Sequence, residues 1–125
     1  MEYVAAAIAL VLIGLFFTIS RRKRIPVALR PRIRKLIAHV ETVQDPSKKI
    51  LEADKVLHEA FKARGTQESL GNCLKRFGSK LPNEQSVWNA HKLRNRIAHE
   101  PMMTVSEKDA KTAVETLLKA ARSLL

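Results

Sequence analysis

The sequence predicts an all-α protein in which one apolar N-terminal helix is followed by a small bundle of about five helices. Residues 3 to 20, YVAAAIALVLIGLFFTIS, carry no charge, and the apolar residues after position 30 recur at helical spacing. No segment shows the alternating pattern of a β-strand. We therefore expect an anchor over 1–20, a basic juxtamembrane connector over 21–35 and a helical bundle over 36–125.

The apolar stretch has nearly the length of a membrane-spanning helix. As a helix it would rise roughly 27 Å at about 1.5 Å per residue, close to the ~30 Å hydrocarbon thickness of a bilayer. A cleaved signal peptide fits less well, because Glu2 is the only charge before the run and no small-residue cleavage site ends it. A buried core helix is the other alternative. We expect a retained single-pass transmembrane helix, with the lipid bilayer as a partner.

Four cations directly after the apolar run predict its orientation: Arg21, Arg22, Lys23 and Arg24. Because lysine and arginine beside a span stay on the cytoplasmic side, we expect the N-terminus outside the inner (cell) membrane and the bundle in the cytoplasm. A single cysteine, Cys73, cannot form an internal disulfide, which agrees with a reducing compartment.

The net charge of +11 is concentrated next to the apolar run. Eight of the 23 basic residues lie within positions 21–35, and 15 basic and 11 acidic residues remain from position 36 onward. The bundle itself therefore carries only a small positive charge. We interpret the basic stretch mainly as a topology signal that also attracts anionic lipid headgroups, and direct contact with nucleic acid as the alternative.

The first two helices of the bundle have clear start signals. Pro31 is tolerated in a first turn and should begin the first helix. Asp45 should cap the second, which should end near Gly65. Each has an apolar face: Ile33, Leu36, Ile37 and Val40 in the first, and Ile50, Ala53, Leu57, Ala60 and Phe61 in the second.

Three more helices are expected after Gly65. Thr66 can cap a helix over about 67–77, and Asn83 can cap the next, which should reach about residue 98. Ser106 can cap the last. The third helix should bury Leu70, Leu74 and Phe77, and the last Ala110, Val114, Leu117, Leu118 and Ala121. A bundle of ~90 residues is small, so dimerisation would help to bury its apolar faces.

Several residues that can carry chemistry have plainer interpretations. His39 and His58 lie on separate helices among ordinary polar neighbours, so surface or packing roles are favoured over metal ligation. Cys73 has apolar neighbours and is interpreted as a small buried residue rather than a reactive thiol. The sequence has no glycine-rich phosphate loop, paired cysteines or HExxH motif. No cofactor and no metal are expected.

The end of the fourth helix, HKLRNRIAHEP at 91–101, is unusually rich in polar residues. Arg94 and His99 are five residues apart, about 140° around an ideal helix, so they could converge only if the helix breaks before His99. We expect that break because Pro101 disfavours helical geometry in the residue before it. Alternatively, Arg96 and His99 have no catalytic role and only interact favourably with the negative end of the helix dipole.

The same helix carries a stripe of Trp88, His91 and Asn95 at helical spacing. Such a stripe is typical of core packing. We therefore interpret Trp88 and His91 as packing residues.

RNRIAH at 94–99 matches the R-x4-6-H motif, with a polar residue directly after the arginine, that marks HEPN domains. EADKVLHEAF, SVWNAHKLRNRIAHEP and the closing amphipathic helix also resemble the layout of that family, over about residues 36–125. The resemblance implies an all-helical domain that commonly dimerises with two motifs facing each other in a cleft. Many members are metal-independent endoribonucleases, whereas others bind nucleotides or partner proteins without catalysis.

The implied motif residues on this chain are Arg94, Asn95 and His99. RNA can be cut without a metal when its own 2′-hydroxyl attacks the neighbouring phosphate. Histidine can act as the base or the acid, and a guanidinium can bind phosphate oxygens bidentately. Asn95 would orient Arg94 or the phosphate.

We therefore predict a membrane-anchored domain that forms a homodimer, binds RNA and cleaves it with Arg94, Asn95 and His99 as the catalytic residues. The alternative is a non-catalytic, membrane-tethered module that binds a nucleotide or an unidentified protein partner. In that case the motif organises the dimer interface.

Overall fold

The computed structural model describes residues 2–21 and 24–125, apart from the side chains of residues 18–21. The described chain is all-helical and contains no strand, which confirms the predicted helical class. Its helices are α1 (Glu2–Arg21), α2 (Arg30–Thr42), α3 (Pro46–Ala63), α4 (Leu70–Phe77), α5 (Glu84–His99) and α6 (Glu107–Ser123), with two single 3-10 turns, η1 (Val27–Leu29) and η2 (Gly78–Lys80).

The predicted transmembrane helix is wrong. Among the described residues, no helix is both long enough and apolar enough to cross a bilayer. This finding overturns the predicted membrane anchor over 1–20. It also overturns the placement deduced from that anchor, in the inner membrane with the N-terminus outside. Residues 22 and 23, two of the cations used for the orientation, lie outside the described residues.

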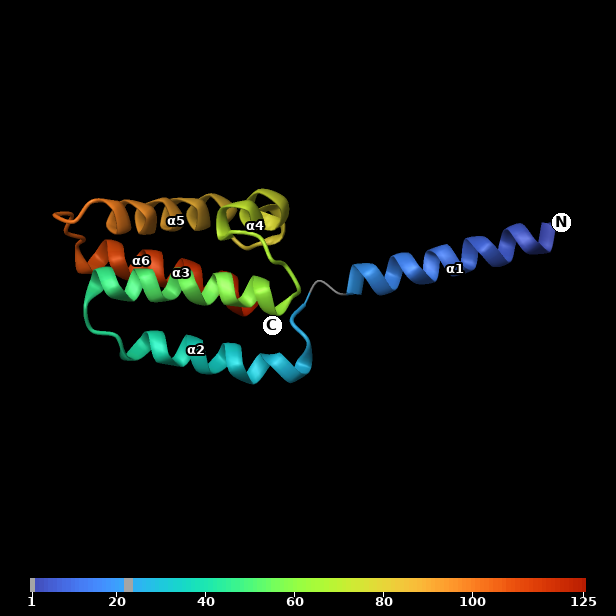
Figure 1. The fold of residues 1–125 in the computed structure, drawn as a ribbon, viewed down its shortest axis with the longest axis horizontal. Coiled ribbons are helices and arrows are strands. Elements are labelled where there is room, and N and C mark those ends of the chain that lie inside the picture. The colour runs from blue at the N-terminus through green and yellow to red at the C-terminus, as the bar shows by residue number, and fades with distance from the viewer. Residues whose placement is uncertain (1, 22–23) are drawn as a thin grey trace.

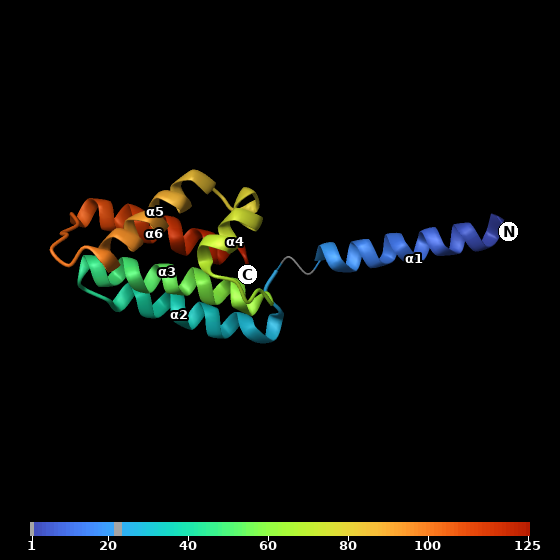
Figure 2. The ribbon, with the colours of Figure 1, turned by 45° about the horizontal axis from the view of Figure 1, so that its top comes forward.

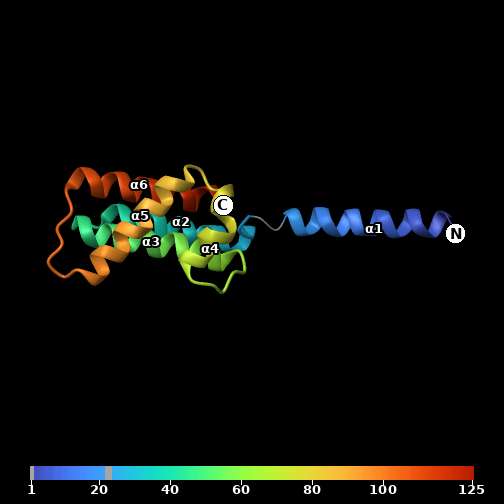
Figure 3. The ribbon, with the colours of Figure 1, turned by 90° about the horizontal axis from the view of Figure 1, so that it is seen from above.

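Helices α2 to α6 form a bundle from which α1 projects (Figure 1). Helix α3 is central and packs against α2, α5 and α6, while α6 also packs against α5. The turned views in Figures 2 and 3 show α5 running obliquely across α3 and α6. The oblique crossing brings the middle of α3 against the middle of α5.

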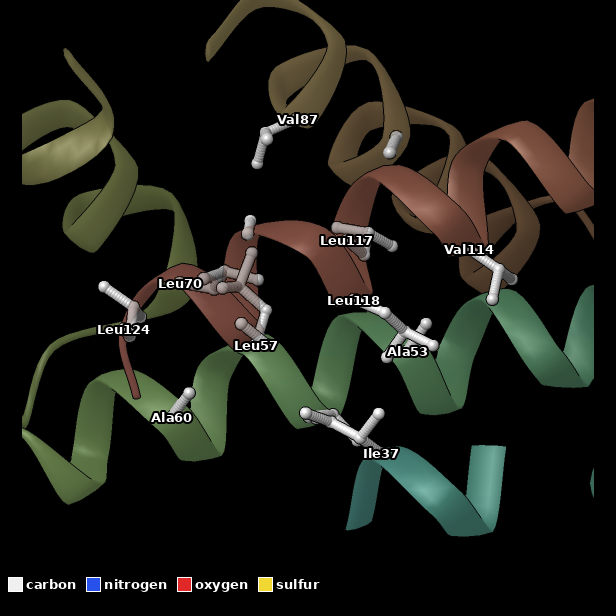
Figure 4. Close-up of a cluster of buried hydrophobic side chains, with 14 of the residues drawn as sticks. Ile37, Ala53, Leu57, Ala60, Leu70, Val87, Val114, Leu117, Leu118 and Leu124 are labelled. Carbon is white, nitrogen blue, oxygen red and sulfur yellow. The ribbon is translucent and has the colours of Figure 1, made fainter. Parts of the chain in front are cut away.

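The core lies mainly between α3 and α6, and Figure 4 shows Leu57 of α3 and Leu118 of α6 among its buried side chains. The apolar positions predicted for these two helices are confirmed as buried: Ile50, Ala53, Leu57, Ala60 and Phe61 in α3, and Ala110, Val114, Leu117, Leu118 and Ala121 in α6. Helical periodicity identified them because one face of each amphipathic helix has to leave water.

The chain joins the bundle before residue 36. Ile25 is buried, and its N–H donates to the carbonyl oxygen of Leu124 over 2.8 Å. Arg30 Nε donates in turn to the carbonyl oxygen of Ile25 over 3.0 Å. Residues assigned to a connector from the sequence thus pack against the last turn of α6.

Two of the predicted caps are confirmed. The Asp45 carboxylate accepts from the Lys48 N–H over 2.8 Å, and the Ser106 hydroxyl accepts from the Asp109 N–H over 3.1 Å. Asn83 precedes α5 as predicted, but it has a φ of 53° and its side chain makes no capping bond. It therefore serves as a turn residue that tolerates left-handed geometry.

The prediction that Thr66 caps the third helix is wrong. Its hydroxyl donates instead to the carbonyl oxygen of Phe61, to which its N–H also donates over 3.2 Å. Thr66 thus closes the end of α3. Helix α4 begins later, at Leu70, where the Ser69 hydroxyl accepts from the Asn72 N–H over 3.3 Å.

Substitution Ser106→Ala is expected to lower the free energy of unfolding by about 1 kcal/mol, because it removes a side-chain acceptor from the first turn of α6. Urea denaturation followed by circular dichroism measures the change. Ser106→Asn, which can still accept the bond, serves as the matched control and should retain most of the stability. Equal losses in the two variants would contradict the capping role.

Candidate functional site

The candidate site is built around a buried carboxylate where α5 crosses α3. Asp54, on α3, is 4% exposed and is the one charged residue that is buried in the described part of the chain. A buried charge is costly unless other groups pair with it and donate hydrogen bonds to it. The partners of Asp54 therefore define the site.

Two side chains of α5 approach this carboxylate from one side of the helix. His91 Nδ1 lies 2.8 Å from Oδ2 of Asp54 and donates to it, since a carboxylate only accepts. Arg94 Nε lies 3.4 Å from Oδ1, an ion-pair distance at which the N–H does not point at the oxygen. This Nε is buried and has no hydrogen-bond partner in the described chain.

Asn95 links the two α5 side chains to each other. Its Oδ1 accepts from Nη1 of Arg94 over 3.1 Å, and its Nδ2 lies 3.5 Å from Nε2 of His91. When Nδ1 of a neutral imidazole donates to Asp54, Nε2 is free to accept from that amide. The four side chains thus close a ring, which we call the Asp54 network: Asp54, His91, Arg94 and Asn95.

Arg94 is more accessible than Asp54 or His91, although its side chain is held on two sides. Its side chain is 37% exposed, compared with 11% for His91. Asp54 and Asn95 engage Nε and Nη1, whereas Nη2 makes no hydrogen bond within the described chain. A guanidinium held in this way has a preset plane, which suits bidentate contact with a carboxylate or phosphate.

The structure brings Arg94 and Asn95 together but leaves His99 apart. The predicted break before His99 is wrong, because α5 continues through His99 and the Glu100 N–H donates to the carbonyl oxygen of Arg96 over 2.8 Å. Pro101 restricts the residue directly before it, and that residue is Glu100, with extended φ and ψ of −113° and 92°. His99 is exposed and lies about 140° around the helix from Arg94.

Sequence reasoning missed Asp54 and misjudged His91. Trp88 is half-buried against the core, with its ring edge-on to His91 at 6.3 Å between centroids, as expected of a packing stripe. His91 belongs to that stripe and also to the Asp54 network. The available signal was an acidic residue four positions after Ile50 and three before Leu57, inside an apolar face.

The other candidate residues lie outside the Asp54 network. His58 Nε2 lies 2.9 Å from the carbonyl oxygen of Glu68, and His39 is exposed. Cys73 is buried, as predicted, and burial raises the pKa of its thiol, with Glu68 adding to the effect. Burial also lowers the pKa of Arg64. Within the described residues, no group of three or more His, Cys, Asp or Glu side chains is placed to hold a metal ion.

No protein-family model, curated protein or solved structure matches this chain. The resemblance to HEPN domains, and the RNA chemistry and partners that it implies, therefore stay predictions. Any functional assignment has to be argued from the geometry of α3 and α5.

Proposed function

We propose that the bundle binds single-stranded RNA and, as a homodimer, cleaves it without a metal ion. The observation that supports this most is the Arg94 guanidinium, which Asp54 and Asn95 hold on two sides while its side chain stays partly exposed. Fixing a phosphate-binding group in advance reduces the entropy lost when the phosphate binds. Arg94 would bind the scissile phosphate and neutralise charge that develops on it.

His99 supplies the proton transfers in this proposal. Its position about 140° from Arg94 on a continuous helix keeps the two side chains of one chain apart. A complete site therefore requires that His99 of one copy lie beside Arg94 of the other, across an interface between the two α5 helices. A homodimer is therefore part of the mechanism, since neither copy has a complete site.

The proposed reaction is an internal transfer of the phosphate. The 2′-oxygen attacks phosphorus, the bond from phosphorus to the 5′-oxygen breaks, and a 2′,3′-cyclic phosphate and a free 5′-hydroxyl result. A base takes the 2′-hydroxyl proton and an acid returns a proton to the leaving oxygen. The one His99 imidazole of each shared site can fill both roles in turn, first taking the 2′-hydroxyl proton and then passing it to the leaving 5′-oxygen.

The Asp54 network also favours a second candidate, a non-catalytic interaction module. Its four side chains contact one another in a closed ring, as a purely structural network would. In that case Arg94 stabilises the crossing of α3 and α5 or a dimer interface. RNA would then stay uncut.

The two candidates are separated by offering the purified full chain a single-stranded RNA and the DNA of the same sequence, both with a chelator. We expect cleavage of the RNA only, because DNA lacks the attacking hydroxyl. Arg94→Lys should rescue poorly, since a point charge cannot replace the planar fork. Arg122→Lys, at an exposed position on α6, is the matched control and should cut like the wild type.

Intact RNA with the wild-type chain would contradict the catalytic proposal and favour the interaction module. Cleavage of the DNA at a comparable rate would contradict the 2′-hydroxyl mechanism.

A further inference from the structure

The outer face of α5 carries a strip of cationic and titratable side chains. Lys92, Arg96 and His99 lie within about 60° of arc on this helix, at spacings of four and three residues. All three are exposed. Arg96 has one ionic contact, from Nε to Glu100 Oε1 at 3.7 Å, which is solvent-exposed and contributes little.

This strip differs from the charged face of α6. Exposed charges on a helix usually alternate in sign, as on α6 with Glu107, Lys108, Lys111, Glu115 and Lys119. In contrast, no acidic residue occurs between Gln85 and His99. The charged side chains between Gln85 and His99 on α5 are therefore all cationic or titratable to a cation, and a cluster of like positive charge attracts a polyanion.

The strip flanks the Asp54 network without belonging to it. Arg94 lies between Lys92 and Arg96 in the sequence but on another side of the helix, where it approaches Asp54. Arg94 is about 160° around the helix from both of them. In the proposed dimer, a chain of phosphates can therefore contact the strip of one copy while one phosphate reaches Arg94 of the other copy.

The strip has few side-chain groups that could recognise the edges of bases. The side-chain amides on α5 already have partners: Gln85 Nε2 donates to Asn89 Oδ1 over 3.0 Å, and Asn95 Oδ1 accepts from Arg94 within the Asp54 network. Lysine and arginine on an exposed face contact mainly phosphates, which carry no sequence information.

Building on the proposed function, we propose that Lys92 and Arg96 form a phosphate-binding strip that takes single-stranded RNA without preference for base sequence. His99 marks the end of the strip at which the proposed cleavage takes place. The strip supplies affinity and register, and Arg94 engages the phosphate at the reacting position.

Trp88 provides a direct readout, because it is the single tryptophan of the chain and lies one turn before Lys92 on the same face. Its fluorescence is titrated with a short oligouridylate at several salt concentrations. Each lost phosphate contact should reduce the slope of log K against log salt by about 0.7. For Lys92→Ser/Arg96→Ser we therefore expect a slope smaller by about 1.4, with an unchanged circular dichroism spectrum.

The matched control is Lys108→Ser/Lys111→Ser, which removes two exposed cations from α6 and should leave the slope unchanged. Oligocytidylate should bind within a few-fold of oligouridylate. An unchanged slope in the strip variant, or a strong preference for one base, would contradict the proposal that Lys92 and Arg96 bind phosphates.

The outcome for the strip can be told apart from the outcome for the proposed function. If Arg94→Ala weakens RNA binding and the strip variant does not, the proposal for the strip is contradicted and the proposed function is not. If the strip variant shows the smaller slope while the wild type leaves RNA uncut, catalysis fails and the strip stands. If the wild-type chain binds no RNA, both are overturned.

Discussion

Mixing the Arg94→Ala and His99→Ala chains is expected to restore RNA cleavage to about a quarter of the wild-type rate. Random pairing makes half of the dimers mixed, and each mixed dimer holds one complete site out of two. Each variant alone should lose activity, and for His99→Ala the loss should be about 10²- to 10⁴-fold, the typical contribution of a general acid or base. The prediction follows from the continuous helix α5, which separates the two side chains in any one chain.

The measurement is the initial rate of RNA cleavage with a chelator present, before and after equal amounts of the two variants exchange partners. A mixture of His99→Ala with a double variant, Arg94→Ala/His99→Ala, is the control and should stay inactive, because no complete site can form. Failure of the first mixture to recover, with dimers verified by sedimentation, would contradict a site shared between two copies. Full activity of His99→Ala alone would remove His99 from the mechanism.

Substitution Asp54→Ala is expected to lower the free energy of unfolding by about 2–4 kcal/mol, because it leaves His91 and Arg94 without their common acceptor in a largely buried position. Asp54→Asn should cost less, since an amide oxygen can still accept from His91. Urea denaturation gives both values.

Glu115→Ala, which removes an exposed acidic residue of α6, is the control for a general effect of charge and should change stability little. A loss in Asp54→Ala no greater than in this control would show that the Asp54 network does not stabilise the crossing of α3 and α5. Retained stability with altered RNA binding would assign the network to positioning Arg94 alone.

Much of the fold follows from local patterns in the sequence. The amphipathic faces of α3 and α6 and the caps at Asp45 and Ser106 depend on residues within one or two turns, so they can be predicted without knowing the tertiary arrangement. Thr66 shows the limit of such reasoning, because the same hydroxyl can cap a following helix or close the preceding one. The predicted break before His99 was wrong for a similar reason. Pro101 restricts only the residue directly before it, and that residue is Glu100.

The Asp54 network could not be predicted in this way. Asp54 and His91 are 37 residues apart, and their contact depends on where α5 crosses α3. Only Arg94 and Asn95, which are neighbours in the sequence, could be grouped beforehand. The helix that carries the site was therefore predicted, but the residue that organises the site was not.

A pulling force on α1 would enter the bundle at Ile25 and pass directly to the last turn of α6, because the Ile25 N–H is bonded to the Leu124 carbonyl oxygen. The bond from Arg30 Nε to the Ile25 carbonyl oxygen ties the same point to the start of α2. The first and last helices of the bundle would share such a load. Both of them pack against α3, which carries Asp54, so a load on α1 would reach the Asp54 network through two helices at once.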